Sequence, residues 1–121
     1  MPHIYEKNGA AIYKESFATI RAEADLSAFT LEEEIIAVRM IHASGMVTLA
    51  QSIRFTSDFA VEARAAIEKG APILCDTKMV SEGITRSRLS NNNQIICTLQ
   101  DPRVKAMSKN AGNTRSAVAI E

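Results

Sequence analysis

The sequence has no tryptophan, and four phenylalanines and two tyrosines are its only aromatic residues. It also lacks an excess of charge, because fourteen Lys and Arg residues balance fourteen Asp and Glu residues. Proteins that bind nucleic acid without sequence preference stack bases on aromatic rings and attract phosphates with positive charge. The sequence therefore argues against a nucleic-acid partner and against binding to an anionic membrane surface.

Long apolar runs are missing as well. The run IIAVRMI is interrupted by Arg39 and is far too short to span a bilayer, and MPHIYEKNG has no apolar core of a secretion signal. The two cysteines, Cys75 and Cys97, form no CxxC motif and no metal-ligand cluster. We therefore expect two small buried hydrophobes, no metal site, no membrane and a cytoplasmic location.

Hydrophobic residues make up 46% of the chain, which is enough for one folded domain over residues 1–121. Helical spacing of apolar residues predicts a first helix from about Ala10 to Ala24. Its buried stripe contains one hydroxyl, that of Ser16. This serine either bonds back to the preceding turn or contacts a ligand, and the spacing leaves both open.

The segment TLEE predicts the start of a second helix, because Thr30 and Glu33 have the spacing of a capping box. Gly45 is a natural end for this helix. One predicted stripe contains Leu31, Ile35, Val38 and His42, and Ile36 and Met40 lie nearly opposite. A helix that is apolar on two sides is packed on two sides, so we expect the second partner to be another subunit.

The second half of the chain alternates helices and strands. We expect Ser57 to cap a helix with Asp58 in its first turn and Gly70 after its end. ILC and QIICTL predict two buried strands on either side of a short helix at KMVSEG. Asp101 and Pro102 predict a further helix, which Gly112 ends.

This order predicts an α/β fold, with βαβ units and a mainly parallel sheet flanked by helices. Parallel sheets have both faces covered and more than two strands as a rule. We therefore expect the sheet to be completed by oligomerisation, or the chain to be an N-terminal portion of a larger α/β domain.

Ligands of open α/β sheets bind beyond the carboxyl ends of the strands. We expect three features at that rim: Asp76, the loop GITRSRL and the helix start GNTRSA. Hydroxyls and guanidinium groups beside free amides suit a carboxylate or a phosphate, although each arginine also fits a solvated surface. The candidate residues are Thr85, Arg86, Arg88, Asn113, Thr114, Arg115 and Ser116.

His42 has no serine or cysteine nucleophile at a suitable spacing, so a catalytic triad has no support. A histidine on an apolar stripe is often a packed core residue. However, His42 is in the last turn of its helix, where free carbonyl groups favour a cation. The residues alone therefore leave a core histidine and a proton donor as alternatives.

Five segments, in this order and with little sequence between them, resemble the precorrin-8X methylmutase family of cobalamin biosynthesis. They are SFATIRAEADLS, MIHASG, FTSDFAVEARAAIEKGAPILCDTKMVSEGITRSRL, ICTLQDPRV and GNTRSA. The most specific piece is APILCD followed by MV and GITR. Members of this family are α/β homodimers, substantially longer than this chain, with the active site near the subunit interface.

The resemblance implies a function. In this family a methyl group moves from C-11 to C-12 of the tetrapyrrole precorrin-8X, which gives hydrogenobyrinate or its cobalt form, without a cofactor. The histidine of the family's H-x-x-G motif, taken as the proton donor, corresponds to His42. Family residues near the substrate correspond to Ser16, Thr85, Arg86 and Arg115. The alternative is a tetrapyrrole-binding or assembly module without turnover.

Overall fold

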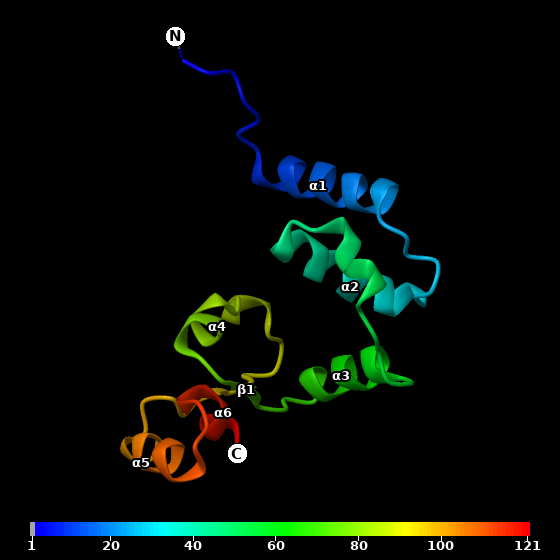
Figure 1. The fold of residues 1–121 in the computed structure, drawn as a ribbon. Coiled ribbons are helices and arrows are strands. Elements are labelled where there is room, and N and C mark those ends of the chain that lie inside the picture. Colours follow the sequence, from blue (N-terminus) through cyan, green and yellow to red (C-terminus); the bar gives the residue numbers. More distant parts are fainter. Residues whose placement is uncertain (1) are drawn as a thin grey trace. The chain divides into compact units, whose positions relative to one another are not determined.

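The computed structural model describes residues 2–121 (Figure 1). The chain packs as two compact units, of which the first ends at Val61 and the second is Glu62–Glu121. Within residues 2–121, no helix has the length and apolar character needed to cross a membrane.

The first unit is helical. It contains α1 (Gly9–Glu23), α2 (Leu31–Ser44) and the 3-10 helix η1 (Val47–Gln51). The side chain of Asn8 accepts hydrogen bonds from the amides of Ala10 and Ala11, which are among the free donors of the first turn of α1. The helix expected from about Ala10 to Ala24 is therefore confirmed within one residue.

Both ends of α2 follow their local signals. The amide of Glu33 donates to Thr30 Oγ1 at 3.3 Å, and the amide of Thr30 donates to Glu33 Oε2 at 2.9 Å, so the capping box is confirmed. Gly45 ends the helix with a φ of 70°, in the left-handed region that glycine adopts without a steric penalty.

The buried side of α2 differs from the expected stripe. Its buried residues are Ala37, Val38 and Ile41, which pack with Ile20 of α1 in the core of this unit. Of the expected stripe of Leu31, Ile35, Val38 and His42, Val38 is buried as expected, whereas the other three residues are exposed, so the stripe is wrong as a continuous buried face. The contact between α1 and α2 includes Ala37, whose small side chain lets the two helices approach closely. The expected stripe was based on large apolar residues and therefore missed this side of α2.

The start of α3 (Phe59–Glu68) also differs from the expectation. Asp58 has a φ of 62°, which is incompatible with a helical first turn, and the helix begins one residue later. Ser57 as the cap and Asp58 as a first-turn residue are therefore wrong. Gly70 follows the helix as expected, with a φ of 91°.

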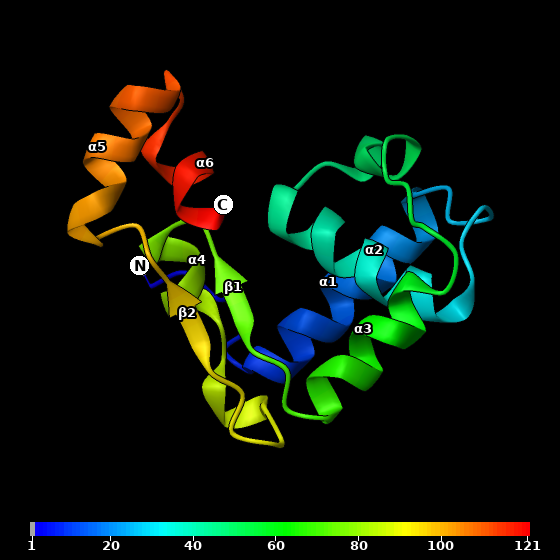
Figure 2. The same cartoon turned by 90° about the horizontal axis from the view of Figure 1, so that it is seen from below.

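The second unit contains the βαβ arrangement (Figure 2). Strands β1 (Ile73–Cys75) and β2 (Ile95–Cys97) pair in parallel, with Cys75 opposite Cys97. The crossover between them contains α4 (Lys78–Gly83) and the 3-10 helix η2 (Arg86–Arg88). The expected α/β fold with a parallel sheet flanked by helices is confirmed, and the sheet has two strands in the described residues 2–121.

The cysteines and the two last helices complete this unit. Cys75 is buried as expected, whereas Cys97 is only half-buried. The side chain of Asp101 accepts from the amide of Arg103 and starts α5 (Pro102–Ala111), as predicted. Gly112 ends α5 with a φ of 62°, and α6 (Arg115–Ile120) follows.

Asn93 fixes the entry to β2. Its side chain is buried, and its Nδ2 donates to the carbonyl oxygens of Ile67 and Ala71, both at 2.8 Å. These carbonyls belong to the end of α3 and to the connection before β1. One amide group therefore ties together the segments that lead into the amino ends of both strands.

Candidate functional site

His42 lies in the last turn of α2, on its exposed surface. Its ring packs edge-to-face on Phe17, with 5.1 Å between the centroids, and its centroid is 5.5 Å from that of Tyr13. Both aromatic residues come from α1. The imidazole is therefore held against an aromatic surface while it remains accessible, and the alternative of a buried core histidine is wrong.

Arg39 belongs to the same group. Its guanidinium carbon is 4.7 Å from the ring centroid of Phe17, and the rings of Tyr13 and Phe17 are 5.7 Å apart. We refer to Tyr13, Phe17, Arg39 and His42 as the histidine cluster. The sequence analysis treated Arg39 only as an interruption of an apolar run. The signal that it missed is the spacing of three residues, which puts Arg39 and His42 on one side of α2.

Ser16 is half-buried on α1, three residues after Tyr13. This spacing places the two residues on neighbouring positions of the same helix side. Ser16 is therefore near the histidine cluster on the surface of α1, and its role as a ligand contact stays a prediction.

Thr85 and Arg86 lie elsewhere, in the exposed crossover of the second unit. The crossover returns to the amino end of β2, where Asn93 is anchored. The hydroxyl of Thr98, just after β2, donates to the carbonyl of Ala119 and thereby places α6 beyond the carboxyl ends of the strands. Figure 2 shows this separation, so the expectation that GITRSRL and GNTRSA share one rim is wrong.

The start of α6 satisfies its own polar groups. Thr114 Oγ1 accepts from the amide of Ala117 at 3.2 Å, and Asn113 Oδ1 accepts from the amide of Thr114 at 2.8 Å. Arg115 is exposed and Ser116 is half-buried. The hydroxyl of Thr114 and the amide oxygen of Asn113 are thus engaged locally, and the guanidinium of Arg115 is the group presented to solvent.

Two carboxyl groups with a lowered pKa, those of Asp25 and Asp101, lie in a turn and at a helix start. A hydrogen bond from the hydroxyl of Ser27 lowers the pKa of Asp25. The side chain of Arg103 donates to Asp101 and lowers the pKa of that carboxyl to about 2. Since both carboxylates serve local backbone structure, neither shift marks a reaction centre. Residues 2–121 contain no group of three or more His, Cys, Asp or Glu side chains that could hold a metal ion.

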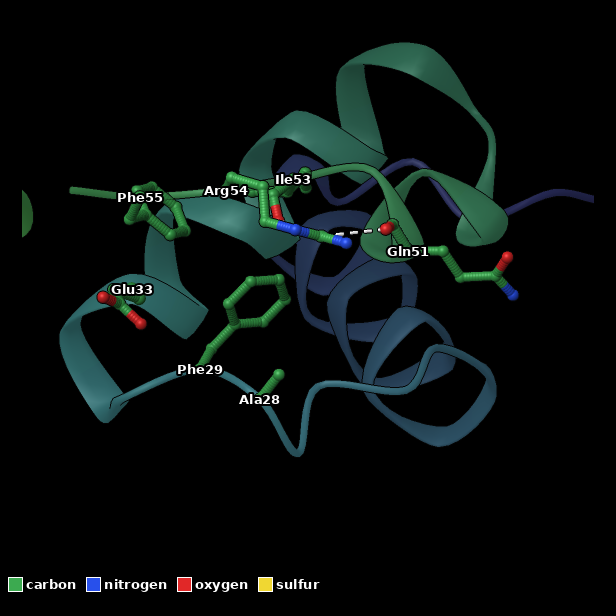
Figure 3. Close-up of a pocket in the computed structure, with 7 residues that line it drawn as sticks. All are labelled: Ala28, Phe29, Glu33, Gln51, Ile53, Arg54 and Phe55. Carbon is green, nitrogen blue, oxygen red and sulfur yellow. Dashed lines mark hydrogen bonds between the residues drawn. The ribbon is translucent and has the colours of Figure 1, made fainter.

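A pocket of about 360 Å³ lies in the first unit, between the start of α2 and the segment after η1 (Figure 3). The edge-to-face pair of Phe29 and Phe55 lines it, and Arg54 Nη1 donates to two backbone carbonyl groups, those of Gln51 and Ile53. Glu33, which also lines it, is nine residues before His42. At about 100° per residue these two side chains lie on opposite sides of α2, so the pocket is separate from the histidine cluster.

Comparison with known proteins gives one consistent answer. Residues 11–121 match the family model described as precorrin-8X methylmutase. A precorrin-8X methylmutase of Sinorhizobium is 55% identical over 117 residues, which cover 97% of this chain and 56% of that protein. A protein of the same name from Pseudomonas aeruginosa is 52% identical with the same coverage.

Solved structures agree with these relatives. The structure of precorrin-8X methylmutase from Thermus thermophilus matches with a TM-score of 0.76 and 33% identity, over 93% of this chain and 54% of that chain. The chain spans about half the length of the curated relatives that it matches.

Proposed function

Because the chain belongs to the precorrin-8X methylmutase family, we propose that it carries the acid-catalytic part of a methyl-shifting isomerase. The proposed substrate is precorrin-8X, in which a methyl group moves from C-11 to C-12 to give hydrogenobyrinate, or the corresponding cobalt forms. The observation that carries this proposal is the position of His42. Its imidazole is accessible, and the rings of Phe17 and Tyr13 hold it in place.

The reaction needs one proton, which His42 donates to the macrocycle and takes back at the end. Protonation of the conjugated macrocycle by His42 withdraws electron density from the carbon skeleton and lowers the barrier for migration of the methyl group. After the C-11 to methyl bond has broken and the C-12 to methyl bond has formed, the macrocycle returns the proton to His42. Substrate and product are isomers, so this reaction consumes no cofactor, and general acid catalysis of this kind contributes about 10²–10⁴-fold to a rate.

The substrate is a large, mainly apolar ring with carboxylates at its edge. It requires apolar walls and positively charged or hydrogen-bonding groups around them. We propose that Ser16 contacts it beside the histidine cluster. In the second unit we propose contacts from Thr85, Arg86, Asn113, Thr114, Arg115 and Ser116, of which Arg86 and Arg115 would meet carboxylates.

Several further expectations form part of the proposal. We propose that residues 1–121 act as one domain, that two chains associate as a homodimer, and that the protein works in the cytoplasm without a bound cofactor or metal ion. The crossover and the start of α6 lie at different ends of the strands in the second unit (Figure 2), and we therefore propose that the two sets of residues contact the macrocycle from different copies of the chain in the homodimer.

The test uses the two histidines of the chain. Purified chain is mixed with precorrin-8X, and conversion is followed from the absorption spectrum for the unchanged protein, for His42→Ala and for His3→Ala. His3 is exposed in the segment before α1 and serves as the matched control. We expect His42→Ala to lower the rate by about 10²-fold or more, and His3→Ala to leave it unchanged.

Two results would contradict the proposal. Conversion that persists in His42→Ala rules out this histidine as the acid. Binding of hydrogenobyrinate without any conversion by the unchanged chain means that the chain is a binding module and not an enzyme by itself.

A further inference from the structure

Resting on the proposed function, we infer that Arg39 is a further substrate-binding residue, whose guanidinium binds a carboxylate at the edge of the macrocycle and orients the ring over His42. Neither its position in the sequence nor its charge singles it out from the other arginines. Its contacts in the histidine cluster do.

Arg39 and His42 are three residues apart on α2 and therefore project from the same side of the helix. Both pack on Phe17, with the guanidinium carbon 4.7 Å and the imidazole centroid 5.1 Å from the centre of that ring. One side chain of α1 thus fixes the direction of a cation and of a proton donor together.

The N–H donors of Arg39 are available for hydrogen bonding. A cation–π contact engages the charge of a guanidinium group and supplies no oxygen acceptor for its five N–H donors. Within residues 2–121, Arg39 has no ion pair and no side-chain hydrogen bond. By contrast, Arg21 pairs with Glu34 at 3.0 Å and Arg54 donates to two carbonyl groups. Arg39 is therefore a fixed cation with its donors available for an acceptor from outside.

The surroundings of Arg39 indicate the kind of ligand that it binds. Tyr13, which is 51% exposed, adds an apolar flat surface next to the imidazole. A flat surface with a guanidinium at its edge complements a flat ring that carries a carboxylate on its rim, because a planar guanidinium binds a carboxylate through two parallel hydrogen bonds. A small inorganic anion would use the cation but not the aromatic surface.

The experiment measures binding of hydrogenobyrinate by absorption titration, in the unchanged chain and in Arg39→Met, Arg39→Lys and Arg21→Met. The methionine keeps the apolar stem and removes the charge. We expect Arg39→Met to weaken binding about 10- to 100-fold, as for the loss of a charged hydrogen bond, and Arg39→Lys to give an intermediate loss. Arg21→Met, an exposed arginine of α1 with its own partner, should change binding less than about twofold.

A second ligand separates recognition from packing. The titrations are repeated with hydrogenobyrinate whose rim carboxylates have been converted to carboxamides. If Arg39 binds a carboxylate, the preference for the acid over the amide should shrink about tenfold in Arg39→Met. A role limited to packing α1 on α2 would weaken both ligands equally and leave that preference unchanged.

The outcomes distinguish this inference from the proposed function. If the unchanged chain binds neither ligand, the proposed function fails and Arg39 fails with it. If the unchanged chain binds the acid and Arg39→Met retains both its affinity and its acid preference, only the inference about Arg39 is overturned. Thermal unfolding of each variant checks that the cluster is still folded.

Discussion

At the scale of single residues, Asn93 connects the end of α3 and the segment before β1 to the segment before β2. Its buried amide donates to Ile67 and Ala71, while its own Oδ1 is buried without a hydrogen-bond partner in residues 2–121. We expect Asn93→Ala to lower the free energy of unfolding by about 1–3 kcal/mol, because two buried carbonyl groups lose their donor. Urea unfolding measures the loss.

Asn91→Ala provides the matched control, since the exposed Asn91 makes one long hydrogen bond of 3.4 Å to the carbonyl of Glu68. It should change the stability by less than about 0.5 kcal/mol. Equal effects of the two substitutions would show that burial of the Asn93 amide has no special importance.

Of the side chains in the histidine cluster, the sequence predicted His42 as a candidate but not the contacts around it. The identity of His42 as a candidate rested on the H-x-x-G motif of a family, because a helical pattern alone also fitted a core position. The contacts of Arg39 and Phe17 could not be predicted. They depend on how α1 crosses α2, and that crossing is set by small buried residues such as Ala37.

At the scale of elements, the start of α5 depends on a charge. The folded protein lowers the pKa of Asp101 from its usual 3.8 to about 2, chiefly through the hydrogen bond from Arg103. A carboxyl group whose pKa is lower in the folded than in the unfolded chain stabilises the fold above its unfolded pKa. This contribution is therefore fully present above about pH 4 and is lost as the pH falls towards 2.

Asp101→Asn tests this dependence, since asparagine keeps the ability to cap the helix without the charge. We expect the variant to be less stable than the unchanged chain at pH 5, and most of this difference to disappear near pH 2. Thermal unfolding at the two pH values makes the comparison. A difference that is the same at both values would mean that ionisation of Asp101 plays no part.

The elements that the sequence predicted best are those with local signals at their ends. Thr30 with Glu33, Gly45, and Asp101 with Pro102 each mark a helix boundary through groups a few residues apart, and all are confirmed. Ser57 and Asp58 carried a similar signal and misled, because Asp58 adopts a positive φ and the chain turns before α3 begins. A local pattern does not report such a backbone angle.

At the scale of the whole molecule, the exposed apolar side of α2 allows a test of the proposed homodimer. Leu31 is 80% exposed and Ile35 is 57% exposed, close to one another on the surface of this helix. We expect a sedimentation mass above that of a monomer, and a shift towards the monomer in Leu31→Glu with Ile35→Lys. A monomeric unchanged chain would contradict the expected homodimer.

The parallel pairing of β1 and β2 was predictable, since a strand, a crossover and a second strand allow little else. The placement of the site residues around that pair was not. The loop GITRSRL belongs to the crossover, which returns to the amino end of β2, whereas the hydrogen bond from Thr98 holds α6 beyond the carboxyl ends of the strands (Figure 2). This placement depends on the path of the crossover through space, which the order of elements along the sequence does not specify.

The register of β1 and β2 has a practical consequence. It sets the only two thiols of the sequence opposite each other, with Cys75 only 4% exposed and Cys97 half-buried. A thiol reagent reaches Cys75 only when the strands open. The labelling rate of Cys75 therefore reports how often the sheet opens locally in the folded protein. The labelling rate of the half-buried Cys97 on the neighbouring strand serves as the reference for that of Cys75. The ratio of the two rates therefore measures local unfolding of the sheet.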